Sequence, residues 1–156
     1  MNMYFCGIDP SLTGCGVVII DKEGQIIKET LISTDAECYI NVEQRLVDII
    51  DQMYFIPQVV GLDNIYVEGL GFTANSTSLF ERQGLFFLIT TFLFTNDINY
   101  KVIPPTKLKK WTTTDGHADK NMMMKVANCR WGINFKNDNI CDAYCLARMA
   151  LEDNYR

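Results

Sequence analysis

Three short apolar segments rich in β-branched residues open the chain, at residues 4–9, 15–21 and 25–33. Turn-forming residues separate them at 10–14 and 22–24. Segments of this length and composition, joined by short turns, are typical of β-strands that pair with their neighbours. The opening of the chain therefore predicts three consecutive antiparallel strands, and any fold that the chain adopts must be built around a sheet.

Helical and strand patterns alternate over the rest of the chain. Apolar residues at positions 42, 46, 49, 50 and 53 lie on one face of a helix over residues 41–54. The later elements are a strand at 65–68, a buried helix at about 79–94, a strand at 100–103, a short Lys-rich helix before the loop at 112–116, and helices at about 118–129 and 138–152. The order β-β-β-α-β-α-β-α-α predicts an α/β fold with a five-stranded mixed sheet flanked by helices, in which residues 1–156 form a single domain.

Composition places the chain among ordinary globular proteins. Its 156 residues are 48% hydrophobic, and the N-terminus lacks the basic and apolar segments of a secretory signal. The apolar run at 79–94 is interrupted by Glu81 and Arg82, so we expect no membrane segment and a cytoplasmic location. The six cysteines form no CxxC pair and lie mostly in apolar runs, which predicts small buried residues in a reducing compartment.

The formal net charge of −5 is unusual for a protein that binds nucleic acid, because phosphates are normally neutralised by a basic surface. The lysines are nevertheless concentrated in one segment. Residues 101–125 hold six lysines and two aspartates, a net +4, which leaves −9 for the rest of the chain. Acidic groups that hold divalent cations also change sign in effect. The composition therefore does not exclude binding to DNA.

Four acidic residues stand at positions where a site can form. Asp9 ends the first predicted strand and Glu68 ends the fourth. The carboxyl ends of strands in open α/β sheets are where ligands bind, so these two side chains are expected to meet there. Asp138 and Asp142 open the last helix four residues apart, which puts both on one helical face.

Carboxylates gathered beside an apolar core are costly unless they are protonated, paired with a base or bound to a hard divalent cation. Two Mg²⁺ or Mn²⁺ ions about 4 Å apart can activate a water molecule and stabilise the leaving oxygen of a phosphodiester. The four acids therefore favour metal-assisted hydrolysis. The structural alternatives are a turn-capping Asp9, a surface Glu68 and an Asp138 that caps its helix.

A different metal site is also conceivable. Cys141 and Cys145 are one helical turn apart, and with Cys129 and His117 they would supply four ligands for zinc, although the spacing matches no standard zinc pattern. His117 lies in a polar stretch near Lys120, where an imidazole could assist proton transfer, but a lone histidine in a loop is more often a surface residue.

Three motifs, GIDPSLTGCGV, IYVEGLGF and NDNICDAYCLA, resemble in that order the motifs of the RuvC family of Holliday junction resolvases. The resemblance spans nearly the whole chain. The first motif alone has little specificity, because a strand, an acid and a glycine-bearing turn also open actin-like ATPases. Three motifs in the family's order are much more specific.

The resemblance implies an RNase H-like fold, a symmetric homodimer, catalysis with Mg²⁺ (or Mn²⁺) and paired nicks across a four-way junction or other branched DNA. It implies that Asp9, Glu68 and Asp142 are catalytic and bind the metal. The family commonly has a further acid three residues before the last one, where this chain has Asn139. Asp138, one residue earlier, is predicted to take its place as a catalytic residue and metal ligand.

The resemblance also suggests the DNA-binding residues. TKLKKW and ADK are similar to the family's basic segment, which implicates Lys109 and Lys120, with Lys107 and Lys110 as neighbours. Phe72, in the polar loop after Glu68, is similar to an aromatic residue that family members place near the junction centre, where it would stack on a base.

The predicted homodimer needs a self-complementary surface. The helix at about 79–94 carries four phenylalanines that would supply one: Phe80, Phe86, Phe87 and Phe92.

The sequence thus predicts a Mg²⁺-dependent endodeoxyribonuclease of the crossover-junction type, from a bacterial cell or a phage-infected host. Two alternatives stay open. One is a DNA-binding module, selective for structure, whose metal site has degenerated at Asn139. The other is a fragment of an actin-like ATPase that binds phosphates through GIDPSLTGCG. Cleavage of DNA with Mg²⁺ distinguishes the enzyme from the binding module, and ATP binding tests the second alternative.

Overall fold

The computed structural model describes residues 3–59, 61–71 and 78–155. Its strands are β1 (Tyr4–Asp9), β2 (Cys15–Asp21), β3 (Ile26–Ile32), β4 (Leu62–Glu68) and β5 (Tyr100–Ile103). Its helices are α1 (Val42–Asp51), α2 (Leu79–Thr95), α3 (Pro105–Thr113), α4 (Lys120–Trp131) and α5 (Asp138–Asn154), with two 3₁₀ turns at Ala36–Cys38 and Ile56–Gln58. The strands and helices expected from the sequence are all present.

The five strands form one mixed sheet in the order β3-β2-β1-β4-β5. β1, β2 and β3 pair antiparallel, as the short turns between them require. β4 pairs parallel to β1 on the other side, and β5 pairs parallel to β4. Because β1 and β4 are adjacent and parallel, their last residues lie at the same edge of the sheet.

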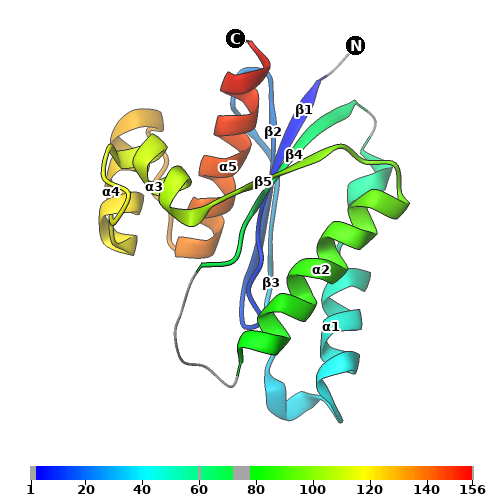
Figure 1. The fold of residues 1–156 in the computed structure, drawn as a ribbon. Helices are drawn as coiled ribbons and strands as arrows, with labels where there is room; N and C mark the ends of the chain where they lie inside the picture. Colours follow the sequence, from blue (N-terminus) through cyan, green and yellow to red (C-terminus); the bar gives the residue numbers. More distant parts are fainter. Residues whose placement is uncertain (1–2, 60, 72–77, 156) are drawn as a thin grey trace.

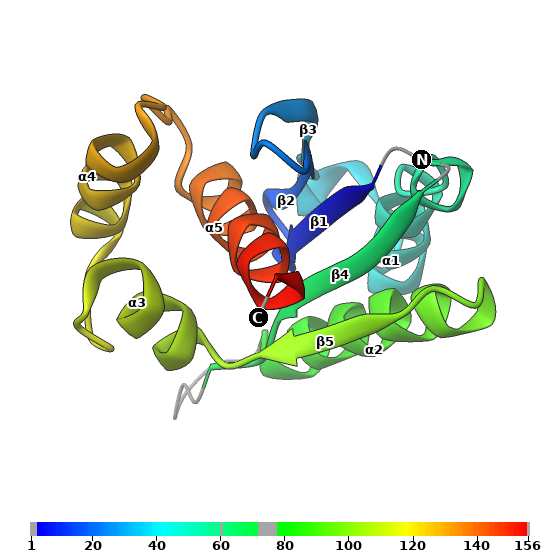
Figure 2. The same cartoon turned by 90° about the horizontal axis from the view of Figure 1, so that it is seen from above.

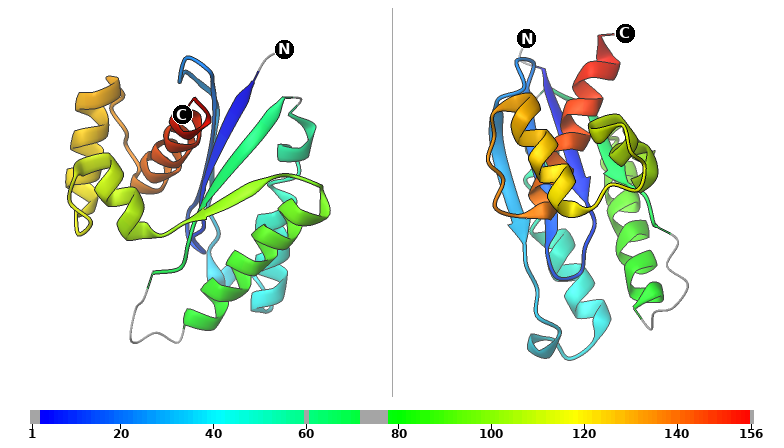
Figure 3. Two further views of the ribbon diagram at one scale, coloured as in Figure 1. Left: turned by 45° about the horizontal axis from the view of Figure 1, so that its top comes forward. Right: turned by 90° about the vertical axis from the view of Figure 1, so that its left-hand side faces the viewer.

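Helices cover both faces of this sheet (Figure 1). α1 and α2 lie side by side on one face, and α5 lies on the other, with α3 and α4 beyond it (Figures 2 and 3). Each face has its own apolar cluster: one includes Phe5 and much of α5, and the other includes Ile8, Ile49 and Leu85. The predicted α/β arrangement, with its mixed five-stranded sheet, is confirmed.

The alternation of side chains along β1 and β4 determines where the two strand-end acids point. Phe5 and Tyr66 belong to the cluster on the α5 face, whereas Ile8 and Val67 belong to the opposite cluster. Successive side chains of a strand face opposite sides of the sheet. Asp9 and Glu68 therefore both fall on the α5 face.

Two glycines let α5 lie close to the sheet. A Cβ atom built on Gly7 of β1 would collide with the backbone carbonyl oxygen of Ala143, and one on Gly16 of β2 would collide with that of Asn139. In both cases the obstacle is backbone, which cannot move aside as a flexible side chain can. The first turns of α5 are thereby brought against the ends of β1 and β2.

The short Lys-rich helix expected before the loop at 112–116 is present as the nine-residue α3, although the predicted order of elements did not count it. The expectation of a buried helix at about 79–94 needs a correction. α2 is not buried on all sides: the side chains of Phe80, Phe87 and Phe94 are 82%, 63% and 73% exposed, while that of Phe92 lies in the core. None of the helices in the described residues combines the length and apolarity needed to span a bilayer.

The cysteines follow the prediction only in part. All six are free thiols. Four are buried as expected, but Cys38 and Cys129 are exposed. Cys129 lies on α4, whereas Cys141 and Cys145 lie inside the cluster under α5. His117 and Cys129 are exposed while Cys141 and Cys145 are buried, and among the described residues these four side chains do not come together as a metal-binding group.

Candidate active site

A cleft of about 570 Å³ lies at the carboxyl ends of β1 and β4. Its walls come from the loop after β1, the residues after β4, Arg45 of α1, and the first turns of α2, α3, α4 and α5. The structure brings all four predicted acids into this cleft: Asp9, Glu68, Asp138 and Asp142. They come from distant parts of the sequence and three different elements.

The fold gives each acid its place. In the β1–β4 register Ile8 lies opposite Val67, so Asp9 and Glu68, the next residues, end neighbouring strands together. Asp138 and Asp142 occupy the first two turns of α5. The N-cap of α5 is Asn137, whose side chain accepts a hydrogen bond from the amide of Ile140 at 3.1 Å. Asp138 is therefore not the cap that the structural alternative required.

Asp9 is the most buried of the acids, with 6% of its surface exposed. Burial raises its pKa well above the usual range, and the nearby charges of Glu68, Asp142 and Asp138 raise it further. Burial also raises the pKa of Glu68, although a hydrogen bond from Asp9 and the charges of Lys109 and Arg82 lower it. These directions fit a pair in which the Asp9 carboxyl group stays protonated and donates a hydrogen bond to the Glu68 carboxylate.

The carboxyl group of Asp142 is held between the other acids. Burial raises its pKa to about 7, with the charges of Glu68 and Asp138 adding to the effect and those of Lys109 and Lys120 opposing it. A carboxyl group that titrates near neutrality is typical of a functional site, where like charges are collected beside a core.

Asp138 has a different environment, because it forms an ion pair with Lys120 of α4. The hydrogen bond from Lys120 lowers the pKa of Asp138, so this carboxylate stays charged. Asn139, the residue at the family's usual position, also lines the cleft, but its side-chain nitrogen lies against Gly14, 2.9 Å from where a Cβ atom would stand. Of Asp138 and Asn139, only Asp138 carries a charge into the cleft.

The predicted DNA-binding residues separate into two groups. Lys109 and Lys120 line the cleft, whereas Lys107 and Lys110 are exposed and lie outside its lining. Phe72 falls outside the described residues. His117 is exposed and is not among the residues of the cleft, so the structure offers no support for its role in proton transfer.

Two arginines that the sequence analysis passed over also line the cleft. Arg82, at the start of α2, acts on Glu68 through its charge, and Arg45 projects from α1. A signal for Arg45 was present in the sequence. It precedes Ile49 by four residues and Met53 by eight, which puts a cation on the apolar face of the helix.

The donor set suits a hard divalent cation. The four acids offer only oxygen ligands, which Mg²⁺ and Mn²⁺ prefer, and a cation would offset the cost of ionising buried Asp9 and Asp142. The described acids do not yet form a three-residue chelate, because Asp9 bonds to Glu68 and Asp138 pairs with Lys120. To hold a metal in common, Asp9 would have to be ionised like the other carboxylates.

The chain is similar to several known proteins. The family model described as crossover junction endodeoxyribonuclease RuvC matches residues 5–149. The proteins of that name from Brachyspira hyodysenteriae and Prochlorococcus marinus are each 30% identical to this chain, over 93% and 81% of its length and 91% and 80% of theirs. Two Thermus thermophilus RuvC structures share the fold, one alone (TM-score 0.77, 17% identity) and one in complex with a Holliday junction substrate (TM-score 0.80, 14% identity). In each pair the match covers 98% of this chain and 96% of the other.

The matched residues include all three motifs, GIDPSLTGCGV among them, so that motif does not indicate an actin-like ATPase. The fold is that of the Thermus thermophilus proteins, which confirms the expected RNase H-like architecture. This chain belongs to the RuvC family of crossover junction endodeoxyribonucleases.

Proposed function

We propose that this chain is an endonuclease dependent on divalent metal, which resolves Holliday junctions or related branched DNA by paired hydrolysis of phosphodiester bonds. Membership of the family supports the activity. The observation that carries the proposal for this chain is the meeting of Asp9, Glu68, Asp138 and Asp142 in one cleft with lysines at its rim. A structural role for these acids would not require three elements to gather them at one point.

In this proposal Asp9, Glu68, Asp138 and Asp142 hold Mg²⁺ or Mn²⁺. When bound, the metal would supply the activation of the attacking water and the stabilisation of the leaving oxygen. Asp9 and Glu68 end hydrogen-bonded strands, so the sheet fixes their positions. Lys109 and Lys120, which line the same cleft, would provide positive charge for the phosphodiester.

We also infer that residues 1–156 act as one nuclease domain and work as a homodimer. A four-way junction has two equivalent scissile phosphates, and a two-fold protein would present one cleft to each. The exposed aromatic side chains of α2 would form the self-complementary face: Phe80, Phe87 and Phe94. Phe86 and Phe92, which were expected on this face, pack toward the core cluster between α1, α2 and the sheet.

The first prediction tests the activity itself. Labelled four-way, three-way and linear DNA are incubated with the protein across titrations of Mg²⁺ and Mn²⁺. We expect paired nicks in the branched substrates only when metal is present, and none in Asp9→Asn or Glu68→Gln. Both variants should still bind the junction in EDTA at least as tightly as the wild type, because Asp9→Asn replaces a carboxyl group that is already protonated there and Glu68→Gln removes a negative charge that faces a polyanion.

Failure of this prediction would be informative. Junction binding without cleavage by the wild type at any metal concentration would favour the non-catalytic binding module. Cleavage at the wild-type rate by Asp9→Asn would remove Asp9 from the site.

The second prediction concerns the departure at Asn139. Because Asp138 carries a full charge and Asn139 offers only an amide dipole, Asp138→Asn should lower the cleavage rate at least about 100-fold, roughly 2.7 kcal/mol of barrier. Asn139→Ala should lower the rate far less. The opposite ranking, or faster cleavage by Asn139→Asp, would show that the family's usual position holds the ligand and that Asp138 does not.

The third prediction follows from the raised pKa values of Asp9 and Asp142. In EDTA the folded protein retains a proton on Asp142 that the unfolded chain has lost, so stability should decrease as pH rises from about 3.8 to about 7. Since each pKa unit is worth about 1.4 kcal/mol, ionisation of Asp142 should lower the free energy of unfolding by about 4 kcal/mol over this whole pH range.

Thermal unfolding at pH 5 and pH 8 measures this effect. Asp142→Asn should reduce the loss of stability between the two, and Mg²⁺ should stabilise the wild type more at pH 8 than at pH 5, because it binds ionised carboxylates. Identical pH dependence in the wild type and Asp142→Asn would contradict the assignment.

The fourth prediction concerns the dimer. Phe87→Glu places a charge on the exposed face of α2 and should convert the dimer to a monomer in sedimentation experiments. Ile27→Glu is the matched control, since Ile27 of β3 is 54% exposed and Phe87 63%. A dimer that survives Phe87→Glu, or that is lost with Ile27→Glu, would place the interface elsewhere.

A further inference from the structure

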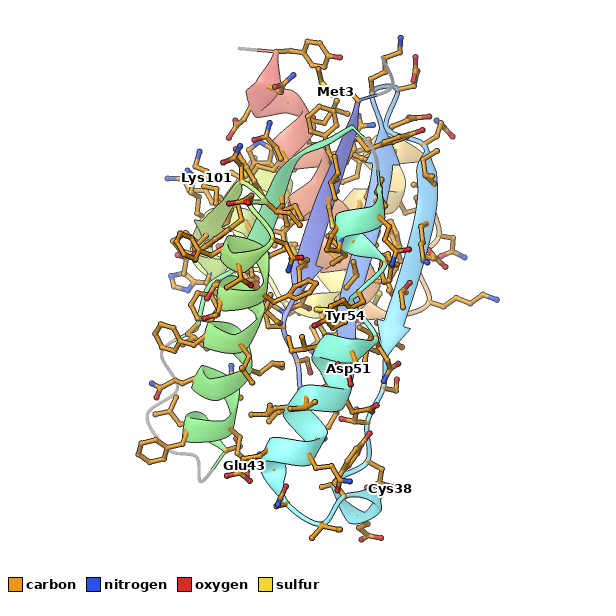
Figure 4. All side chains as sticks on the ribbon, turned by 90° about the vertical axis from the view of Figure 1, so that its right-hand side faces the viewer. Met3, Cys38, Glu43, Asp51, Tyr54 and Lys101 are labelled. Atoms are coloured by element: carbon orange, nitrogen blue, oxygen red, sulfur yellow. The ribbon has the colours of Figure 1, made fainter. Side chains whose placement is uncertain are left out.

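The cleft contains one cation whose surroundings differ from those of the lysines. Arg45 is only 6% exposed, although it lines the same cleft as the four acids. It lies in the first turns of α1, near Glu43, which Figure 4 labels at the lower end of that helix. A charged side chain is rarely buried to this extent unless it is paired.

The partners of Arg45 are neutral. Its Nε donates to the hydroxyl of Thr34 at 2.8 Å, and its Nη2 donates to the carbonyl oxygens of Leu12 at 2.8 Å and Thr34 at 3.1 Å. Among the described residues no carboxylate forms an ion pair with it. Desolvation of the guanidinium is therefore offset by these hydrogen bonds and not by an opposite charge.

These bonds connect three parts of the chain that meet behind the cleft. Thr34 follows β3 and is itself 7% exposed, and its hydroxyl donates to the same Leu12 carbonyl that Arg45 binds. Leu12 lies at the centre of the loop that joins Asp9 to β2. Arg45 and Thr34 together thus fix the segment that begins at the most buried acid of the site.

We infer that Arg45 is a positioning residue for Asp9: it holds the 10–14 loop through Leu12, with Thr34 as its partner, and so keeps the Asp9 carboxylate facing Glu68 and Asp142. This inference rests on the proposed function for its effect on cleavage. A loop held by two donors on one carbonyl limits movement of the backbone that follows Asp9. An apolar residue at position 45 would fill the space but would leave the Leu12 carbonyl oxygen without its charged hydrogen-bond donor.

Arginine suits this place for a geometric reason. Its planar guanidinium presents several N–H donors in a fixed arrangement, so one side chain can bind two carbonyls and a hydroxyl at once. Lysine has the charge but not this arrangement. The variant Arg45→Lys therefore separates the role of the hydrogen bonds from that of the charge.

The test compares Arg45→Met, Arg45→Lys and Thr34→Val with a stability control, Ile49→Val. Ile49 is fully buried on the same face of α1 and makes none of these hydrogen bonds. Four quantities are measured: the cleavage rate at saturating DNA, the Mg²⁺ concentration for half-maximal rate, junction affinity in EDTA, and amide hydrogen exchange at residues 11–14.

We expect Arg45→Met to lower the cleavage rate or the apparent metal affinity by about 10-fold to 100-fold, as is usual for partners that orient a metal ligand. Exchange at 11–14 should become faster, and junction affinity in EDTA should stay within about 2-fold, an effect of less than roughly 0.5 kcal/mol on binding. Arg45→Lys and Thr34→Val should show smaller changes of the same kind, and they decide the question if Arg45→Met does not fold. Ile49→Val should change only the unfolding temperature.

Unaltered exchange at 11–14, equal loss of cleavage in Ile49→Val, or a large loss of junction affinity in Arg45→Met would overturn the inference. Failure of the proposed function would look different, because the wild type itself would then cut no branched DNA. In that case hydrogen exchange and Mn²⁺ binding measured by calorimetry, neither of which requires cleavage, decide whether Arg45 positions the loop and Asp9.

Discussion

The close approach of α5 to β1 and β2 is the constraint on which the site depends. It exists because Gly7 and Gly16 have no side chain where the backbone carbonyls of Ala143 and Asn139 lie. Interiors are packed densely enough that even one methyl group at such a point must displace the helix or the strand. Any displacement of α5 would carry Asp142 away from the strand ends, so two residues without side chains control the distance between acids that they do not touch.

The four acids repel one another when they are ionised, and the surrounding residues reduce this repulsion but do not remove it. Lys109 lowers the pKa values of Glu68 and Asp142, and Lys120 pairs with Asp138. The raised pKa values of Asp9 and Asp142 show that compensation is incomplete in the absence of metal. This incomplete compensation would favour a bound divalent cation over protons, and a bound cation would let an acidic protein present this site to a polyanion.

Most of this arrangement could be predicted from the sequence, because it depends on local patterns. Apolar β-branched segments and turn residues place Asp9 and Glu68 at strand ends, helical spacing puts Asp138 and Asp142 on one face, and the resemblance to the family implied that Asp142 shares a site with Asp9 and Glu68. Arg45 was missed because an apolar stripe is normally identified from its apolar members, and a buried cation is visible only once its partners are known. The prediction that α2 is buried was wrong for another reason. Its run of apolar residues has no polar side, so no periodicity distinguishes exposed Phe87 from the core residues.

The two halves of the site rest on different supports. The acids belong to β1, β4 and α5, whereas Lys109 and Lys120 belong to α3 and α4. These two helices contact the rest of the domain mainly through α5 (Figure 2). Arg130 of α4 joins these helices: it donates to the carbonyls of Trp111 and Thr112 at the end of α3, lies over the Trp111 ring, and pairs with a carboxylate of α5 at 3.9 Å. The Lys120–Asp138 pair is then a second connection, at the cleft itself, and the 76% exposure of the Lys120 side chain weakens this ion pair. DNA that draws Lys120 to a phosphate would free Asp138 at low cost, so arrival of the polyanion and completion of the acidic site would favour one another.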